Sequence, residues 1–266
     1  MPSSEDRTAT AVTRIEDSLK GYVFTVQEFA RLSAIAIAGI FRKPYYIEET
    51  FYYMDQIGVG SLFILALTGL FTGMVLTLQG AIQLQPFGAV PYVSRLVSTS
   101  VVRELGPVLA ALMLAGRVGT GIASELASMQ VTEQIDALRA EGTDPIKKLV
   151  TPRLVATLVM VPILTIITNG IAMAGGYFIA RLYLSIDSFF YWTWAFEALR
   201  PMDLVYGVIK PLVFGFIICM VGCYAGLTST GGTVGVGHST TQAMVTSSIL
   251  ILMSDFFMTK LFIYLG

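Results

Sequence analysis

Long stretches without any charged side chain are the feature that most limits what this chain can fold into. Two apolar runs, Ile57–Leu78 and Leu154–Ala180, contain no Asp, Glu, Lys or Arg, and none lies between Lys210 and Asp255. About 20 consecutive apolar residues suffice for a helix to cross a bilayer. Only 13% of the residues are charged, whereas soluble domains average about 25%. We therefore predict an all-α integral membrane protein rather than a soluble enzyme or a disordered chain.

Five membrane spans are predicted. The stretch Leu96–Ala123 counts as one of them although it contains Arg103, Glu104 and Arg117. The last uncharged stretch is too long for one helix, and its Gly-, Ser- and Thr-rich centre, Thr228–Gln242, divides it in two. The predicted spans are, in chain order, Ile57–Leu78, Leu96–Ala123, Leu154–Ala180, Leu204–Leu227 and Ala243–Leu265.

The segment before the first span is predicted to be an amphipathic helix. Over Arg14–Phe41 apolar residues recur at helical spacing, with charged residues largely between them. The segment is too polar as a whole to span, so we expect it to lie in the membrane interface; a small soluble cap is the alternative. The predicted organisation is an N-terminal interfacial region, residues 1–45, followed by a membrane domain, residues 46–266.

Basic residues are unevenly distributed among the segments that connect the spans. The N-terminal region and the second loop are rich in Lys and Arg, whereas the first loop contains only Arg95. Because basic loops stay in the cytoplasm, we expect a cytoplasmic N-terminus and an external C-terminus. The first twenty residues contain no apolar signal core and are acidic, so neither a secretory signal nor a transit peptide is expected.

The second loop contains a predicted short helix. Thr132 can cap it, Ile135 and Leu138 give it an apolar face, and Gly142 and Pro145 end it. Such a helix between two spans can dock in a groove of a soluble partner and transmit motion. A solvated loop helix without a partner is the alternative. Arg117 and Glu125, near the inner end of the second span, are expected to position this helix.

Four charged residues on three predicted spans are expected to share the outer half of the bilayer. Arg103, Glu104, Lys210 and Asp255 lie about 9–15 Å inside the outer ends of their spans at 1.5 Å per residue. Charges at this depth usually face a cavity or a partner. We hypothesise one polar network lining an outward-facing cavity; ion pairs that only join helices are the alternative.

The end of the first span is a second, apolar candidate. Leu76, Leu84 and Phe87 lie in a stretch without formal charge that leaves the membrane on the outer side. They could shape a pocket for acyl chains, and ordinary contact between helix and lipid is the alternative.

The second span and second loop resemble a known family. Four short runs are similar to the MlaE family. They are Arg103-Glu104-Leu-Gly-Pro, the later Gly-Arg117-Val-Gly and Glu125-Leu-Ala-Ser-Met, and Val-Thr-Glu133-Gln-Ile-Asp136-Ala-Leu. These proteins, also called YrbE, are permease subunits of Mla/Mce-type lipid ABC transporters. The glycine-rich stretch Gly232–Thr241 is similar to the family's glycine-rich loop. The resemblance covers roughly residues 50–265.

The resemblance implies a function and a set of partners. It implies a homodimer with two cytoplasmic ABC ATPase subunits, a periplasmic MCE-domain ring and, in some members, a STAS-domain subunit. The substrate would be phospholipid or a related lipid, moved between the bacterial inner membrane and the outer envelope to maintain outer-membrane asymmetry. ATP and magnesium would bind the partner ATPase, so no cofactor and no catalytic residue are expected on this chain. By the same likeness, the residues of the ATPase-coupling helix are Glu133, Asp136, Leu138, Arg139 and Gly142.

Other classes of protein are less well supported. The 17 basic and 18 acidic residues nearly cancel, which gives no footprint for nucleic acid. Cys219 and Cys223 form half a zinc site at most and are predicted to be packing residues. A self-sufficient channel or ion-coupled transporter needs no docking helix. An intramembrane enzyme would need a nucleophile and a base, and His238 beside Ser239 lacks the rest of such a constellation.

Overall fold

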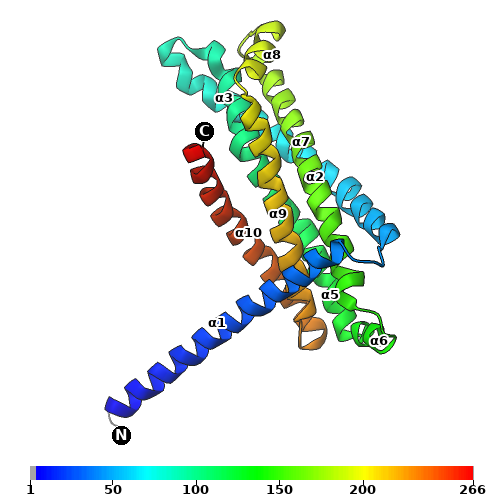
Figure 1. Ribbon diagram of the computed structural model, residues 1–266. Coiled ribbons are helices and arrows are strands. Elements are labelled where there is room, and N and C mark those ends of the chain that lie inside the picture. Colours follow the sequence, from blue (N-terminus) through cyan, green and yellow to red (C-terminus); the bar gives the residue numbers. More distant parts are fainter. Residues whose placement is uncertain (1–3, 266) are drawn as a thin grey trace.

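The protein is a bundle of long helices, as the uncharged runs predict (Figure 1). The computed structural model describes the backbone of residues 4–265 and the side chains of residues 20, 21 and 23–264. Every regular element in this part of the chain is helical, which confirms the all-α prediction. The elements are α1 (Ser4–Ile40), α2 (Ile47–Leu84), η1 (Gln85–Phe87), η2 (Val90–Tyr92), α3 (Val93–Ser100), η3 (Val101–Leu105), α4 (Gly106–Leu114), η4 (Ala115–Gly119), α5 (Thr120–Val131), α6 (Gln134–Ala140), η5 (Ile146–Val150), α7 (Thr151–Leu182), α8 (Ser188–Glu197), α9 (Pro201–Leu227) and α10 (Gly232–Leu265).

Six helical stretches of the described chain are long and apolar enough to cross a bilayer. Four of them contain a predicted span in full, and the fifth ends one residue short of the predicted Ala243–Leu265; each begins before its apolar run. These five are Ile47–Phe87, Val90–Val131, Ile146–Leu182, Pro201–Leu227 and Gly232–Tyr264.

The sixth stretch lies in the predicted interfacial helix and is a candidate span in addition to the five predicted ones. Val23–Ile40 meets the criteria of length and composition, although the longer segment Arg14–Phe41 is too polar on average. The charged first half of Arg14–Phe41 lowers the average hydropathy of the whole segment, so the apolar second half does not stand out. The side chains of residues 14–19 lie outside the described ones. The C-terminal part of α1 packs beside α7, where the Thr151 hydroxyl donates to the Ala36 carbonyl at 3.4 Å. From there α1 slants away from the bundle (Figure 1).

Glycines allow α2 and α7 to pack in close contact along much of their length. A Cβ added at Gly73 would lie 1.8 Å from the Ala172 carbonyl oxygen, and one at Gly175 would lie 2.4 Å from the Leu70 carbonyl oxygen. Small residues of this kind let helix backbones approach where lipid offers no hydrophobic driving force. The second span packs against both of these helices and α9 packs against α7, whereas α10 packs on the outside against α9 and the second span.

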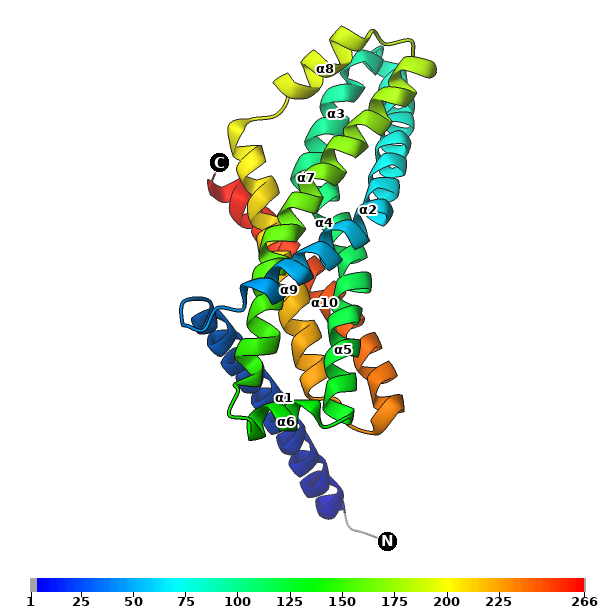
Figure 2. The same ribbon diagram turned by 90° about the vertical axis from the view of Figure 1, so that its right-hand side faces the viewer.

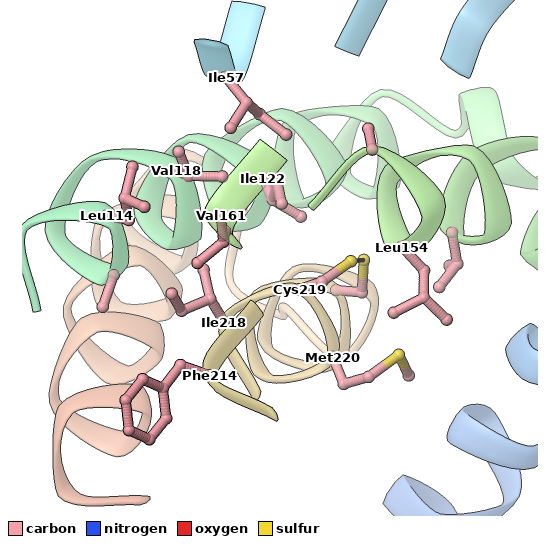
Figure 3. Close-up of a cluster of buried hydrophobic side chains, with 14 of the residues drawn as sticks. Ile57, Leu114, Val118, Ile122, Leu154, Val161, Phe214, Ile218, Cys219 and Met220 are labelled. Carbon is pink, nitrogen blue, oxygen red and sulfur yellow. Dashed lines mark hydrogen bonds between the residues drawn. The ribbon is translucent and has the colours of Figure 1, made fainter. Parts of the chain in front are cut away.

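One buried apolar cluster contains residues of all five predicted spans and of α1, and part of it is shown in Figure 3. Ile57 of α2 and Leu154 of α7 meet Ile122 of α5 and Ile218 of α9 in this cluster. Cys219 lies in it as well, with its Sγ 3.9 Å from the Sγ of Cys223 one turn later. Both cysteines are buried and are not joined in a disulfide, in keeping with the packing role predicted for them.

The second span is interrupted by two π-helical turns. Between α3 and α5 the chain forms η3 and η4, each five residues long. Arg103 and Glu104 lie in η3, and Arg117 lies in η4. A π-turn widens the helix locally and often marks a functional position. All three charged residues of the predicted span Leu96–Ala123 therefore lie where its helical geometry changes.

The bundle has two distinct ends. Helix α6 lies at one end, and α3 and α8 lie at the other (Figures 1 and 2). The sequence analysis did not predict α8, whose first turn is capped by the Asp187 carboxylate accepting from the Phe189 amide at 2.9 Å. Its Tyr191 is buried, and this burial raises the pKa of the phenol. The exposed Phe189 and Phe196 give α8 an apolar outer surface.

Candidate functional site

Lys210 is the centre of a polar cluster in the half of the bundle nearer α8. Its ammonium group forms ion pairs with Glu104 Oε2 at 2.5 Å and with Asp255 Oδ1 at 2.9 Å. It also donates to the Thr259 hydroxyl at 2.8 Å and to the Arg103 carbonyl at 3.1 Å. The Lys210 side chain is only 1% exposed, so its charge is stabilised by these contacts rather than by solvent.

Three helices contribute to this Lys210 cluster. Lys210 comes from α9, Asp255 and Thr259 come from α10, and Glu104 comes from η3 of the second span. The Thr259 hydroxyl also lies 3.1 Å from Glu104 Oε2. The structure thus brings together Glu104, Lys210 and Asp255, three of the four charged residues that the sequence hypothesis combined.

The fourth residue, Arg103, has a different ionic partner. Its Nε lies 3.0 Å from Asp203 Oδ1, and only its backbone carbonyl contacts Lys210. Asp203 is buried in the first turn of α9, where its other carboxylate oxygen accepts from the Arg200 amide. The sequence analysis missed Asp203 because it lies one residue before the predicted span, Leu204–Leu227. The cluster therefore contains two cations and three carboxylates.

A cavity of about 250 Å³ opens beside the Lys210 cluster. Polar groups of Arg103, Glu104 and Lys210 form part of its wall. Another part is apolar, where the rings of Tyr206 and Phe262 stack with their centroids 4.1 Å apart. This Lys210 cavity combines charged and apolar surfaces, which suits an amphiphile better than a bare ion.

The residues proposed for an acyl pocket lie in different surroundings. Leu76 and Leu84 are partly buried and pack against a small cluster of buried apolar side chains that includes Ala81 and Val93. Phe87, in η1, is 81% exposed. Packing between helices accounts for the first two without a ligand.

Helix α6 forms the predicted short helix of the second loop. Ile135 is fully buried and Leu138 packs against the main core cluster, so the apolar face of α6 is anchored to the bundle. Its polar face is exposed, with Arg139 Nη1 and Asp136 Oδ1 paired at 2.8 Å. Gly142 follows the helix with a positive φ of 77°, a conformation that favours glycine.

The predicted cap of this helix is wrong. The Thr132 hydroxyl donates back to the Ser128 carbonyl at 2.8 Å and so belongs to the end of α5. Glu133 takes the N-cap position with a positive φ of 58° and no capping hydrogen bond from its side chain. The Glu133 side chain lies on the surface.

A second polar cluster lies in the half of the bundle nearer α6. Arg153 at the start of α7 is fully buried, and its Nη2 lies 2.7 Å from Glu125 Oε1. Its guanidinium also lies over the ring of Tyr53, 4.3 Å from the centroid. Glu125 therefore ties α5 to α7 rather than contacting α6 directly. Arg117, in contrast, bonds the Ser61 hydroxyl of α2 at 2.6 Å.

These features define a polytopic α-helical membrane protein with charged clusters inside the bundle and a short helix exposed at one end. A family model described as Permease MlaE matches residues 50–261. The chain belongs to the MlaE permease family, which confirms the predicted resemblance.

Several curated relatives share this assignment. A probable ABC transporter permease protein of Rickettsia conorii is 45% identical over 238 residues, which cover 90% of this chain and 92% of the relative. A probable ABC transporter permease protein of Synechocystis is 43% identical and covers 78% of this chain and 79% of the relative. The protein TRIGALACTOSYLDIACYLGLYCEROL 1, chloroplastic, of Arabidopsis thaliana is 36% identical and covers 87% of this chain and 67% of the relative. The chain is thus a transmembrane transporter subunit of the ABC transporter permease type.

Proposed function

We propose that this protein is the permease subunit of an ATP-driven transporter that moves phospholipids or related lipids between the bacterial inner membrane and the outer envelope. The observation that carries the lipid part is the Lys210 cavity, whose wall is charged on one part and aromatic on another. A lipid needs both surfaces, one for its head group and one for its chains. The name of the Arabidopsis relative is that of a diacylglycerol lipid, which is in line with this substrate class.

The proposed mechanism divides the chemistry between chains. The permease contributes no catalytic residue, and a separate ABC ATPase hydrolyses ATP with magnesium. Helix α6 is the proposed docking element, because its apolar side is anchored through Ile135 while Asp136 and Arg139 face outward. A force on α6 would be transmitted to α5, which is the end of the second span. The same span carries Glu104, which lines the Lys210 cavity. ATP-driven motion could thereby alter the shape of this cavity.

The proposed assembly contains two copies of the chain in the inner membrane. Helix α10 exposes many large apolar side chains, among them Ile249, Phe256 and Phe257, and a second copy or lipid would cover them. The N-terminus and α6 would face the cytoplasm, and α8 and the C-terminus would face the periplasm. A periplasmic MCE-domain ring, and in some assemblies a STAS-domain subunit, would complete the transporter and help to maintain outer-membrane asymmetry.

Affinity purification from bacterial membranes in mild detergent tests this assembly. Mass spectrometry should find a stoichiometric ABC ATPase, an MCE-domain protein and bound phospholipid. Recovery of the chain alone, still able to move a solute across liposomes without ATP, would overturn the proposal. That outcome would favour a self-sufficient channel or an ion-coupled transporter.

A charge swap tests the role of the cluster itself. Lys210→Asp combined with Asp255→Lys preserves the opposite charges of a pair that is 2.9 Å apart. An assembled complex that has lost lipid transfer would support a role of these groups in the cavity. Full transfer by the swapped protein would show that the charges only join α9 to α10.

A further inference from the structure

A second cavity lies in the half of the bundle nearer α6, separate from the Lys210 cavity. It has a volume of about 250 Å³ and lies between the start of α2, the η4–α5 part of the second span and the start of α7. Its polar lining residues are Tyr53, Gln56, Arg117, Glu125 and Arg153. We call it the Arg117 cavity.

The charges around this cavity do not cancel. Arg153 is buried, and its guanidinium is neutralised by Glu125 at 2.7 Å and also donates to the Leu149 carbonyl at 2.6 Å. Arg117 is exposed and, within the described side chains, has no carboxylate within ion-pair distance. Two guanidinium groups and one carboxylate leave a net charge of +1. Arg117 is therefore the accessible, uncompensated cation of the Arg117 cavity.

The position of Arg117 is built into the fold. Its Nη1 donates to the buried Ser61 hydroxyl at 2.6 Å. The guanidinium lies close over Gly60, where an added Cβ would meet Nη2 at 2.3 Å. Holding the side chain at η4 against α2 in this way reduces the conformational entropy that binding a ligand would cost. The plane of the guanidinium then presents its remaining N–H donors as a fixed fork.

The surroundings identify the chemical class of the ligand. Tyr52 and Tyr53 lie near the start of α2, and the Gln56 amide donates to the Tyr52 hydroxyl at 2.7 Å. Tyrosines concentrate at the level of lipid head groups. The planar guanidinium fork fits phosphate oxygens with two parallel hydrogen bonds. An uncompensated arginine beside these tyrosines would be placed to meet the phosphate layer of one leaflet.

We propose that the Arg117 cavity binds a phosphate group, supplied by a phospholipid of the leaflet on the α6 side. Arg117 is the principal contact, and the second hydrogen of the Gln56 amide offers a further donor, whereas the Tyr53 hydroxyl already donates to Glu125 Oε1 at 3.5 Å. The Glu125 carboxylate also lines the cavity, and its pairing with Arg153 limits its repulsion of the phosphate. This site does not depend on which substrate the protein transports, because it would hold a lipid of the surrounding membrane.

Native mass spectrometry of the purified full-length protein tests this proposal. The probes are phosphatidylglycerol, diacylglycerol with the same chains but no phosphate, and inorganic phosphate. The wild type should retain one phosphatidylglycerol that Arg117→Gln loses, with binding weakened about tenfold or more. Arg117→Lys should recover part of it. The matched control is Arg181→Gln, an exposed arginine near the opposite end of α7.

The outcomes distinguish a lipid phosphate from a soluble phosphate, and both from a purely structural role of Arg117. Inorganic phosphate that competes at millimolar concentration would support the site but assign it to a soluble phosphate. Equal retention of diacylglycerol, or unchanged phosphatidylglycerol retention by Arg117→Gln, would overturn the proposal. Ser61→Ala removes the contact that fixes Arg117 but keeps the cation, and it should retain most of the lipid. All these variants leave the Lys210 cluster intact, so lipid held in the Lys210 cavity is counted separately.

Discussion

Replacing Lys210 by methionine should destabilise the bundle strongly. The substitution keeps the length of the side chain but removes the cation that pairs with Glu104 and Asp255. Removing one partner of a buried ion pair costs about 3–5 kcal/mol. Most of this cost comes from Asp255, whose side chain is 19% exposed, because the 40% exposed Glu104 is better solvated and contributes less. At about 2–4 °C per kcal/mol for a chain of this size, the apparent Tm should fall by about 6–20 °C.

Thermal unfolding of the detergent-purified protein, followed by tryptophan fluorescence, measures this shift. Lys260→Met is the matched control, because this lysine of α10 is exposed; its Tm should change by about 2 °C or less. Adding Glu104→Gln and Asp255→Asn to Lys210→Met should restore most of the loss, since no buried charge is then left unpaired. A Tm of Lys210→Met within about 2 °C of the wild type would refute the idea that this pairing holds α9, α10 and η3 together.

Three further substitutions probe other parts of the account. Gly73→Ala should prevent the close packing of α2 and α7, because the new Cβ would lie 1.8 Å from the Ala172 carbonyl oxygen. The yield of folded protein should collapse, whereas Gly170→Ala, with open space around it, should be tolerated; equal yields would contradict the reasoning. Asp187→Ala removes the cap of α8 and should cost about 1 kcal/mol in a denaturant melt, with no change refuting a role for the cap. Asp136→Arg on exposed α6 should leave Tm unchanged but abolish ATPase co-purification, and normal co-purification would argue against α6 as the docking element.

The membrane fold could be predicted from the sequence because its signal is local. Uncharged runs such as Ile57–Leu78 report directly on the cost of burying charge in lipid, so five spans were found in the right order. The sixth candidate, Val23–Ile40, was hidden because it shares one helix with a charged segment. Helix α8 was missed because its ten residues are too few to span and its aromatic residues show no clear helical alternation.

The polar clusters could be predicted only in part. Charges inside spans identify residues that need partners, and Glu104, Lys210 and Asp255 do meet. Pairing depends on how helices rotate against one another, which spacing along one chain does not encode. The sequence therefore did not reveal that Arg103 pairs with Asp203. Nor did it reveal that the buried Arg153 pairs with Glu125, because Arg153 lies one residue before the predicted span Leu154–Ala180.

The most direct test of the account is ATP-dependent lipid movement by the reconstituted transporter. The permease and its co-purified partners are placed in liposomes that contain a fluorescent phospholipid, and transfer of that lipid to an acceptor is measured with ATP and with a non-hydrolysable analogue. We expect transfer only with ATP, and its loss in the charge swap of Lys210 and Asp255. Transfer that is equally fast without ATP hydrolysis, or no lipid transfer by an assembly with an active ATPase, would contradict the proposed function.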